Sequence, residues 1–272
     1  MQNDNSMSPQ GHGHAAGKLG VLLRESAQDL FARILAAECE RFLRTFDDLR
    51  DERGRASVVR NGYQPTRCIE TGIGLVPVRV PKLRNRTGGA TIFRSSIVPR
   101  YVRRTGASTR EAVWRYLYGI WCCNLNQVLV ALLGARATHL AGVVPESVRS
   151  AWVGECQDRH SRPFGELRPI EIWAECISPD PGWCVAPGSM LAVVGVAAGG
   201  GLDLLGLDHG QADTHSRWIG VVQSLRSRGL QMPEQFNSSA AANGFGQALG
   251  AHTPEHTPEL THSIERGSIT YT

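Results

Sequence analysis

The sequence predicts a mixed α/β protein in which a mainly helical N-terminal region precedes a smaller α/β domain. In the first 160 residues apolar side chains recur at helical spacing, whereas three short apolar runs separated by Pro/Gly-rich turns follow from residue 170. A chain of 272 residues has room for two modest domains, and 42% hydrophobic residues suffice for a core in each. Two folded regions of different character are therefore expected.

The N-terminal region begins with a polar leader and a helix. Residues 1–17 are rich in Gly, His and Ser and lack the apolar core of a signal peptide, so we expect a disordered leader. Residues 27–49 carry apolar side chains three or four positions apart with charges between them, which predicts an amphipathic helix. The apolar positions are Leu30, Phe31, Ile34, Leu35, Phe42, Leu43 and Phe46.

An extended arm is predicted at residues 72–86, inside a basic region that spans residues 18–160. Every second residue from Val76 to Val80 is a valine, so a strand here has one apolar face. Pro77 and Pro81 confine such a strand to a sheet edge or to an arm. The arm ends in basic residues suited to phosphates or to a minor groove, namely Arg79, Lys82, Arg84 and Arg86.

Helical character returns at residues 109–133, and residues 124–158 predict a helix, a connection and a second helix. Pro145 suits the first position of that second helix. The arrangement is compatible with a helix-turn-helix motif whose second helix carries Arg149, but the long connection fits an ordinary helical hairpin equally well. The buried side of the second helix is expected to contain Val148, Trp152 and Cys156.

The α/β domain is expected at residues 165–232. Three strands are predicted at residues 170–177, 190–197 and 202–207, and Gly199–Gly201 is a hairpin turn rather than a phosphate loop because no Gly-Lys-Ser/Thr follows. Asp213 and Thr214 then cap a helix that Gly229 ends. Three strands followed by a helix match the opening of a ribonuclease-H-like domain, although many α+β folds begin in this way. The helix is expected to bury Trp218, Val221, Val222 and Leu225.

The remaining segment, residues 233–272, is predicted to be a degenerate, disordered tail. Small polar residues fill positions 237–243, and the sequence His-Thr-Pro-Glu occurs twice between positions 252 and 259.

Charge is segregated along the chain. Residues 41–115 contain seventeen Lys/Arg against six Asp/Glu, a net charge of +11 in a chain whose total is +4. Such a block predicts binding to a polyanion, and double-stranded DNA is the expected partner, whereas an ordinary solvated surface is the alternative. The candidate DNA-binding residues are Arg60, Arg67, Arg79, Lys82, Arg84, Arg86, Arg103, Arg104, Arg110 and Arg149.

Other features narrow the class of protein. No apolar run reaches the eighteen or so residues of a membrane span, and seven cysteines without a Cys-x-x-Cys pair argue against a disulfide framework and a zinc ribbon. We therefore expect a cytoplasmic protein without a membrane partner, associated with the nucleoid when bound to DNA; homo-oligomerisation is left open.

Several motifs together resemble the mutator-type transposases of bacterial insertion sequences. The resemblance runs from about residue 58 to about residue 232. In the basic region it rests on three motifs, Arg60-Asn61-Gly62-Tyr63, Val78-Arg79-Val80-Pro81-Lys82-Leu83-Arg84 and Ser108-Thr109-Arg110-Glu111. In the α/β domain it rests on Leu205-Gly206-Leu207-Asp208-His209-Gly210, which is followed by Trp218, Leu225, Arg228, Gly229 and Leu230. It implies binding to the ends of an insertion sequence and a ribonuclease-H-like core, so the full expected fold is a helical DNA-binding region followed by an incomplete domain of that kind.

The resemblance also implies two Asp and one Glu that hold two Mg²⁺ or Mn²⁺ ions. This chain departs from that pattern. Glu175 stands in the place of the first Asp, as the candidate catalytic and metal-binding residue, and Ser238-Ser239-Ala240-Ala241 stands where the second is expected. The third acid would lie beyond residue 250, where the tail resembles the product of a frame change or truncation.

Retained strand transfer is therefore not expected, and three function classes stay open: an active transposase, a DNA-binding remnant that competes with an intact transposase, and a decayed product without activity. A different metal site, formed by Asp208, His209, Asp213 and His215, is less favoured because turn and cap roles account for both aspartates. No cysteine is marked as a nucleophile by its sequence context.

Overall fold

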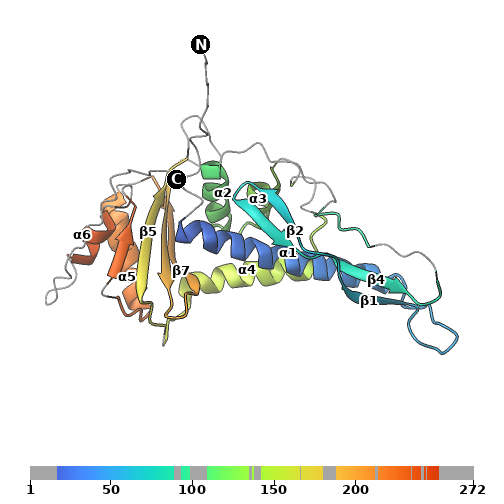
Figure 1. Ribbon diagram of the computed structural model, residues 1–272. Helices are drawn as coiled ribbons and strands as arrows, with labels where there is room; N and C mark the ends of the chain where they lie inside the picture. The colour runs from blue at the N-terminus through green and yellow to red at the C-terminus, as the bar shows by residue number, and fades with distance from the viewer. Residues whose placement is uncertain are drawn as a thin grey trace, which may run out of the picture. The chain divides into compact units, whose positions relative to one another are not determined.

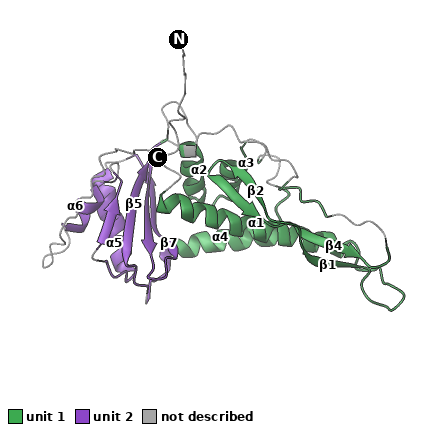
Figure 2. Cartoon of the chain, in the orientation of Figure 1, with its two compact units in different colours: residues 1–159, 179–183 green, residues 160–178, 184–272 purple. Residues whose placement is uncertain are grey.

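The computed structural model describes residues 17–88, 93–98, 109–134, 137, 142–165, 167–179, 188–211, 214–233, 235–239, 242 and 244–250. The chain divides into two compact units, residues 1–159 with 179–183 and residues 160–178 with 184–272 (Figure 2). Both units combine helices with sheets, which confirms the mixed α/β prediction (Figure 1). The predicted leader, except for Gly17, lies outside the described residues.

Four helices belong mainly to the first unit. They are α1 Lys18–Arg44, α2 Thr109–Trp121, α3 Leu125–Leu133 and α4 Glu146–Ser161. Helix α1 begins earlier than predicted, because Leu19 and Leu23 extend its apolar stripe toward the N-terminus and are each only 1% exposed. The Asn124 side chain caps α3 by accepting a hydrogen bond from the Asn126 amide at 3.1 Å, so the chain turns sharply between α2 and α3.

Helix α4 packs through the apolar side that the sequence predicted. Val148, Trp152 and Cys156 are its buried residues, which confirms the expected apolar side. On its polar side Glu155 accepts a hydrogen bond from Arg33 of α1 at 2.5 Å. This ion pair is half-exposed, so packing of the apolar side rather than the pair supplies most of the stability.

A long, interrupted β-hairpin lies between α1 and α2 in the sequence. Its first limb contains β1 Val58–Tyr63 and β2 Arg67–Thr71, and its second contains β3 Gly74–Val78 and β4 Pro81–Asn85. β2 pairs with β3 next to the turn, and β1 pairs with β4 farther out, both antiparallel. Between the two pairs the Gln64 amide donates to the Val80 carbonyl at 2.8 Å, so the limbs stay together throughout.

The turn of this hairpin is buried among the helices. Thr71 is 5% exposed and Ile73 is fully buried. At Gly72 a Cβ atom would lie 2.3 Å from the Ala131 carbonyl oxygen and 2.6 Å from the Ala112 Cβ, so only glycine fits between α2 and α3 at this point. The hairpin is therefore anchored at its turn, and it runs beside α1 toward the C-terminal end of that helix (Figure 1).

The arm predicted at residues 72–86 is thus not a free arm but the second limb of a hairpin. The alternation that predicted it is confirmed, because Val76, Val78 and Val80 are all buried. A single strand with one apolar face leaves its backbone amides unpaired, and pairing with the first limb satisfies them. For the same reason the region of residues 18–160 is less helical than expected.

The second unit is built on a four-stranded sheet. Its strands are β5 Glu171–Ile177, β6 Ser189–Val196, β7 Leu202–Gly210 and β8 Gln235–Ser238, in the order β7-β6-β5-β8. β5, β6 and β7 form an antiparallel meander, whereas β8 runs parallel to β5. The turn between β6 and β7 is closed by the Ala197 amide, which donates to Gly201 at 2.9 Å, so the predicted glycine hairpin is confirmed.

Two helices cover one face of this sheet: α5 Thr214–Ser227 and α6 Gly244–Gly250 (Figure 1). The predicted inner side of α5 is confirmed, with Trp218 at its centre and fully buried. Ile172, Ala174 and Cys176 supply the sheet's side of this core.

The prediction that order ends at residue 233 is wrong for residues 235–239, 242 and 244–250. Phe245 is fully buried against Trp218, with ring centroids 5.2 Å apart, and Ala248 and Leu249 are buried beside it. The sequence did not predict α6, because three apolar positions among small and polar residues in a seven-residue helix give too little periodicity to detect. Residues 251–272 lie outside the described part of the chain.

Phe245→Ala should lower the free energy of unfolding of the second unit by about 3–5 kcal/mol, because it removes a buried aromatic side chain. Gln247→Ala, at an exposed position on the same helix, is the matched control and should change stability by less than about 0.5 kcal/mol. Urea unfolding followed by tryptophan fluorescence measures both. Equal stability of the two variants would show that residues 244–250 do not pack into the core.

Candidate nucleic-acid interface and candidate acidic site

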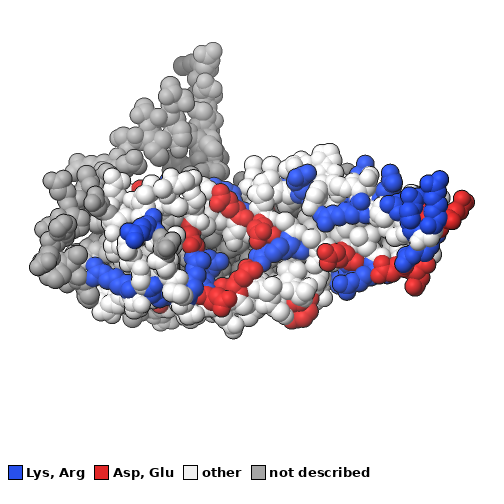
Figure 3. All heavy atoms as spheres, turned by 90° about the horizontal axis from the view of Figure 1, so that it is seen from below, with Lys and Arg blue, Asp and Glu red and all other residues white. Residues whose placement is uncertain are grey.

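Exposed basic side chains gather at the end of the first unit that is formed by β1, β4 and the loop of residues 50–56 (Figure 3). We refer to these three segments as the basic ribbon. β4 shows the reason for the exposure, since Pro81 and Leu83 are buried and the alternate residues point outward. The exposed basic residues of the ribbon and its immediate flanks are Arg50, Arg53, Arg55, Arg60, Arg79, Lys82, Arg84 and Arg86.

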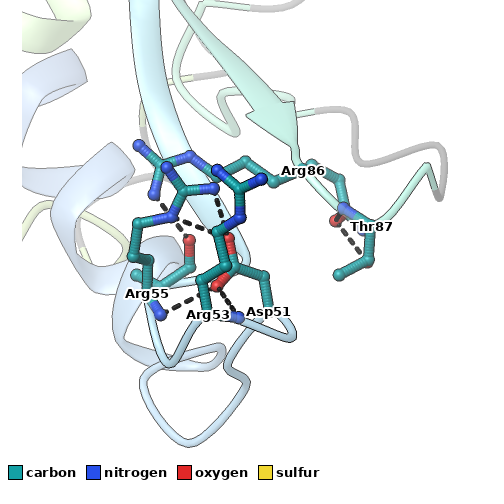
Figure 4. A network of polar contacts seen from close by, with 7 residues as sticks. Asp51, Arg53, Arg55, Arg86 and Thr87 are labelled. Atoms are coloured by element: carbon teal, nitrogen blue, oxygen red, sulfur yellow. Dashed lines mark hydrogen bonds and ion pairs between the residues drawn. The ribbon is translucent and has the colours of Figure 1, made fainter.

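Asp51 fixes the conformation of the loop. One carboxylate oxygen, Oδ1, accepts from the Arg53 amide at 3.0 Å and from the Arg55 amide at 2.9 Å, while Oδ2 binds the Arg55 guanidinium. The Arg55 amide is the first cause that holds the pKa of Asp51 below its ordinary value. Figure 4 shows that the guanidinium groups of Arg53, Arg55 and Arg86 gather on one side of this loop. Asp51 thus fixes the loop backbone and the Arg55 side chain, while Arg86 donates to the Ala56 carbonyl at 3.3 Å.

Where the two strand pairs of the hairpin meet, Tyr63 and two arginines form a second group. The Cζ atoms of Arg60 and Arg79 each lie 4.7 Å from the centroid of the Tyr63 ring. Arg60 Nη2 also donates to the Tyr63 hydroxyl at 2.5 Å. The tyrosine is 46% exposed, so the two guanidinium groups are held at the protein surface. We call these three residues the Tyr63 cluster.

A β-bulge produces the Tyr63 cluster. Arg60 pairs with Leu83 and Tyr63 with Pro81, so β1 contains one residue more than β4 between these pairs. Gly62 provides the extra residue with a φ of 76°, which favours glycine. Without the bulge Tyr63 would point to the face opposite Arg60, because side chains alternate along a strand.

The structure does not bring all the predicted DNA-binding residues together. Arg60, Arg79, Lys82, Arg84 and Arg86 lie on the basic ribbon or at its ends. The other described candidates lie elsewhere: Arg67 donates to the Val98 carbonyl at 3.0 Å, Arg110 lies in the first turn of α2, and Arg149 binds Glu146 and Asn126.

Two predicted residues, Arg103 and Arg104, lie outside the described residues. Sequence reasoning did not single out Arg53 and Arg55 of the loop, nor Tyr63. The loop arginines belong to the basic block, but their shared carboxylate is visible only in the fold. Tyr63 stands in the Arg-Asn-Gly-Tyr motif, and the glycine of that motif was the available signal for a bulge.

Glu175 lies on β5 with its side chain on the face opposite Ala174 and Cys176, which belong to the core under α5 and α6. Burial raises the pKa of Glu175 above its ordinary value of 4.5, so the surroundings favour the neutral carboxyl. The end of β8 lies beside this position, because the Ser239 amide donates to the Ala174 carbonyl at 3.0 Å. Ser239, the residue that follows β8, is therefore the next residue along that strand beside Glu175.

The described residues around Glu175 do not form a site for a pair of divalent cations. Within the described part of the chain, no three His, Cys, Asp or Glu residues are grouped so that they could hold a metal ion. Mg²⁺ requires several oxygen donors at fixed positions, and Glu175 alone supplies one carboxyl group.

The other candidate metal cluster is not assembled by the described residues either. Asp208 accepts from Arg217 Nε at 2.7 Å, and the same guanidinium donates to Ser189 and Gly210. His209 follows on the opposite face of β7. Asp213 lies outside the described residues. The structure thus gives Asp208 a partner in Arg217, which joins α5 to the ends of β6 and β7.

The described cysteines are free thiols. Burial raises the pKa of Cys156 to about 12 and also raises the pKa values of Cys39 and Cys122. At neutral pH these three stay protonated, which is unsuited to nucleophilic chemistry. No helix in the described ranges combines the length and apolar character that a membrane crossing requires.

Family membership follows from comparison with known proteins. Residues 6–259 match the family model "Transposase, Mutator family", so the chain belongs to the Mutator family of transposases. One relative is the transposase for insertion sequence element IST2 of Acidithiobacillus ferrooxidans, 24% identical over 136 residues, which cover 48% of this chain and 44% of that protein.

A second relative is the probable transposase for insertion sequence element ISRM3-like of Sinorhizobium fredii (strain NBRC 101917 / NGR234). It is 28% identical over 219 residues, which cover 79% of this chain and 50% of that protein. The chain thus spans about half the length of the curated relatives that it matches.

Glu175→Gln should alter the pH dependence of stability. Because the folded-state pKa of Glu175 is raised, its favourable contribution is complete below the ordinary value of 4.5 and is lost as pH rises through the folded-state pKa. The amide cannot ionise, so the stability of the variant relative to the wild type should increase over that pH range. Urea unfolding at pH values on both sides of the ordinary pKa measures the difference.

Glu40→Gln, at an exposed position on α1, is the control for removing a surface carboxylate. A Glu175→Gln variant that loses stability relative to the wild type as pH rises would show that burial does not raise the pKa of this carboxyl group.

Proposed function

We propose that this chain binds double-stranded DNA at the ends of an insertion sequence through the basic ribbon, and that it does not catalyse strand transfer. The observation that carries the proposal is the basic ribbon itself, where eight exposed Lys and Arg residues lie along one hairpin and its preceding loop. A surface of this charge suits the phosphates of a duplex, since each neutralised phosphate releases condensed counterions.

Membership of the Mutator family supports DNA as the polyanion, because insertion-sequence transposases act on DNA. The relatives are described as transposases of insertion sequence elements, which supports element ends as the bound sequence. The hairpin also supports the proposal mechanically. Its turn is held among α1, α2 and α3, so the basic ribbon is presented on a fixed base and loses little conformational entropy when it binds.

The second unit supports a ribonuclease-H-like catalytic domain in its order of elements, with a three-stranded meander, a helix and a strand that returns beside β5. Its acids do not support activity. Two-metal displacement needs several carboxylates converging on one point, and the end of β8 brings Ser239 rather than an acid beside Glu175. A chain that binds element ends without cutting them would compete with an intact transposase; a decayed product that binds nothing is the alternative.

Binding of the full chain to duplex DNA should weaken steeply with salt. If five to eight phosphates are neutralised, the slope of log K against log salt concentration should be about −4 to −7. The double variant Lys82→Ala/Arg84→Ala should flatten that slope by about 2, because two contacts are removed. Fluorescence anisotropy with a labelled duplex measures both.

Arg168→Ala removes one exposed charge from the second unit and should leave the slope unchanged. Binding that is undetectable at low salt, or that does not depend on salt, would refute the proposed DNA-binding function.

The chain should neither nick nor join DNA that carries the element's ends, with Mg²⁺ or with Mn²⁺. Glu175→Asp should not restore activity, because it shortens one carboxylate and supplies no second one. A strand-transfer assay with labelled ends, analysed on denaturing gels, tests this. Metal-dependent cleavage that Glu175→Ala abolishes would overturn the assignment of the second unit as inactive.

A further inference from the structure

The Tyr63 cluster differs from the rest of the basic ribbon in how its arginines are held. Lys82 and Arg84 are exposed side chains on one face of β4. Arg60 and Tyr63 lie on the opposite face, as the pairing of Arg60 with Leu83 and of Tyr63 with Pro81 requires, and Arg79 contacts the Tyr63 ring. The arginines of the Tyr63 cluster are therefore positioned by a ring contact on one face of the ribbon, whereas Lys82 and Arg84 lie exposed on the other face.

Positioned arginines suit recognition of bases better than neutralisation of phosphates. An arginine loses rotamer entropy when a ligand fixes it. Contact with the Tyr63 ring already restricts the rotamers of Arg60 and Arg79, so less entropy is lost on binding. The bond from Arg60 to the Tyr63 hydroxyl uses one of its five N–H groups, which leaves the fork of donors that matches the O6 and N7 atoms of guanine. A phosphate contact would need no such positioning.

The dimensions of the hairpin favour the major groove. A two-stranded ribbon with its side chains fits a groove about 12 Å wide, whereas the minor groove, about 6 Å wide, admits a single extended chain. Because residues 72–86 form one limb of a paired hairpin, insertion of that segment alone into a minor groove would require its strands to separate.

We propose that the Tyr63 cluster reads guanine in the major groove of the bound duplex, and that Tyr63 is a positioning residue for Arg60 and Arg79. This inference rests on the proposed DNA-binding function and adds its specificity determinant. Lys82, Arg84 and the loop arginines contribute affinity through phosphates and carry no preference for sequence.

The test compares two duplexes of equal length, one made of G·C pairs and one of A·T pairs, each titrated with the full chain at fixed salt. The wild type should prefer the G·C duplex by about 5- to 150-fold, the range that one good bidentate base contact provides. Tyr63→Leu should reduce this preference to near unity and leave the salt slope almost unchanged. Tyr63→Phe keeps the ring and should retain most of the preference.

The double variant Lys82→Ala/Arg84→Ala is the matched control. It should weaken binding to both duplexes equally and keep the preference. Because Tyr63 is 46% exposed, thermal unfolding of Tyr63→Leu should match that of the wild type. Equal wild-type affinities for the two duplexes, a preference for A·T, or a preference that survives Tyr63→Leu would each overturn the inference. Failure to bind either duplex would instead refute the proposed DNA-binding function.

Discussion

The burial of one β-turn among three helices is the constraint on which the first unit depends. Gly72 lies so close to Ala131 and Ala112 that no larger residue fits, and Ile73 next to it is fully buried. Both limbs of the hairpin start from this anchored turn. A two-stranded ribbon alone has marginal stability in water, so its attachment to a helical core is what allows the outer pair, β1 and β4, to persist.

Anchoring at one end lets the other end carry charge. Self-repulsion among eight exposed basic residues destabilises any compact arrangement of them. The ribbon limits this cost by placing Lys82 and Arg84 on one face and the Tyr63 cluster on the other, while Asp51 offsets the charge of the loop. The arginines near Tyr63 gain a favourable ring contact in addition. The same geometry that separates like charges thus exposes them to a polyanion.

The second unit depends on helices that close one face of its sheet. Trp218 of α5 and Phe245 of α6 meet edge to face, and Ile172 and Ala174 of β5 complete this core. Parallel pairing of β8 with β5 brings the end of β8 beside Glu175. Ser238 at the end of β8 pairs with Ala174, and the Ser239 amide donates to the Ala174 carbonyl.

The sequence by itself determined the elements with strong periodicity. The valine alternation at 76–80, the buried side of α4 and the inner side of α5 follow from residue spacing, because burial of one face imposes a period of 2.0 or 3.6 on the chain. Only the tertiary structure decided which strands pair, that α6 belongs to the core, and that a bulge at Gly62 turns Tyr63 toward Arg60. Pairing and bulges depend on contacts between residues far apart in the sequence, and local spacing carries no information about them.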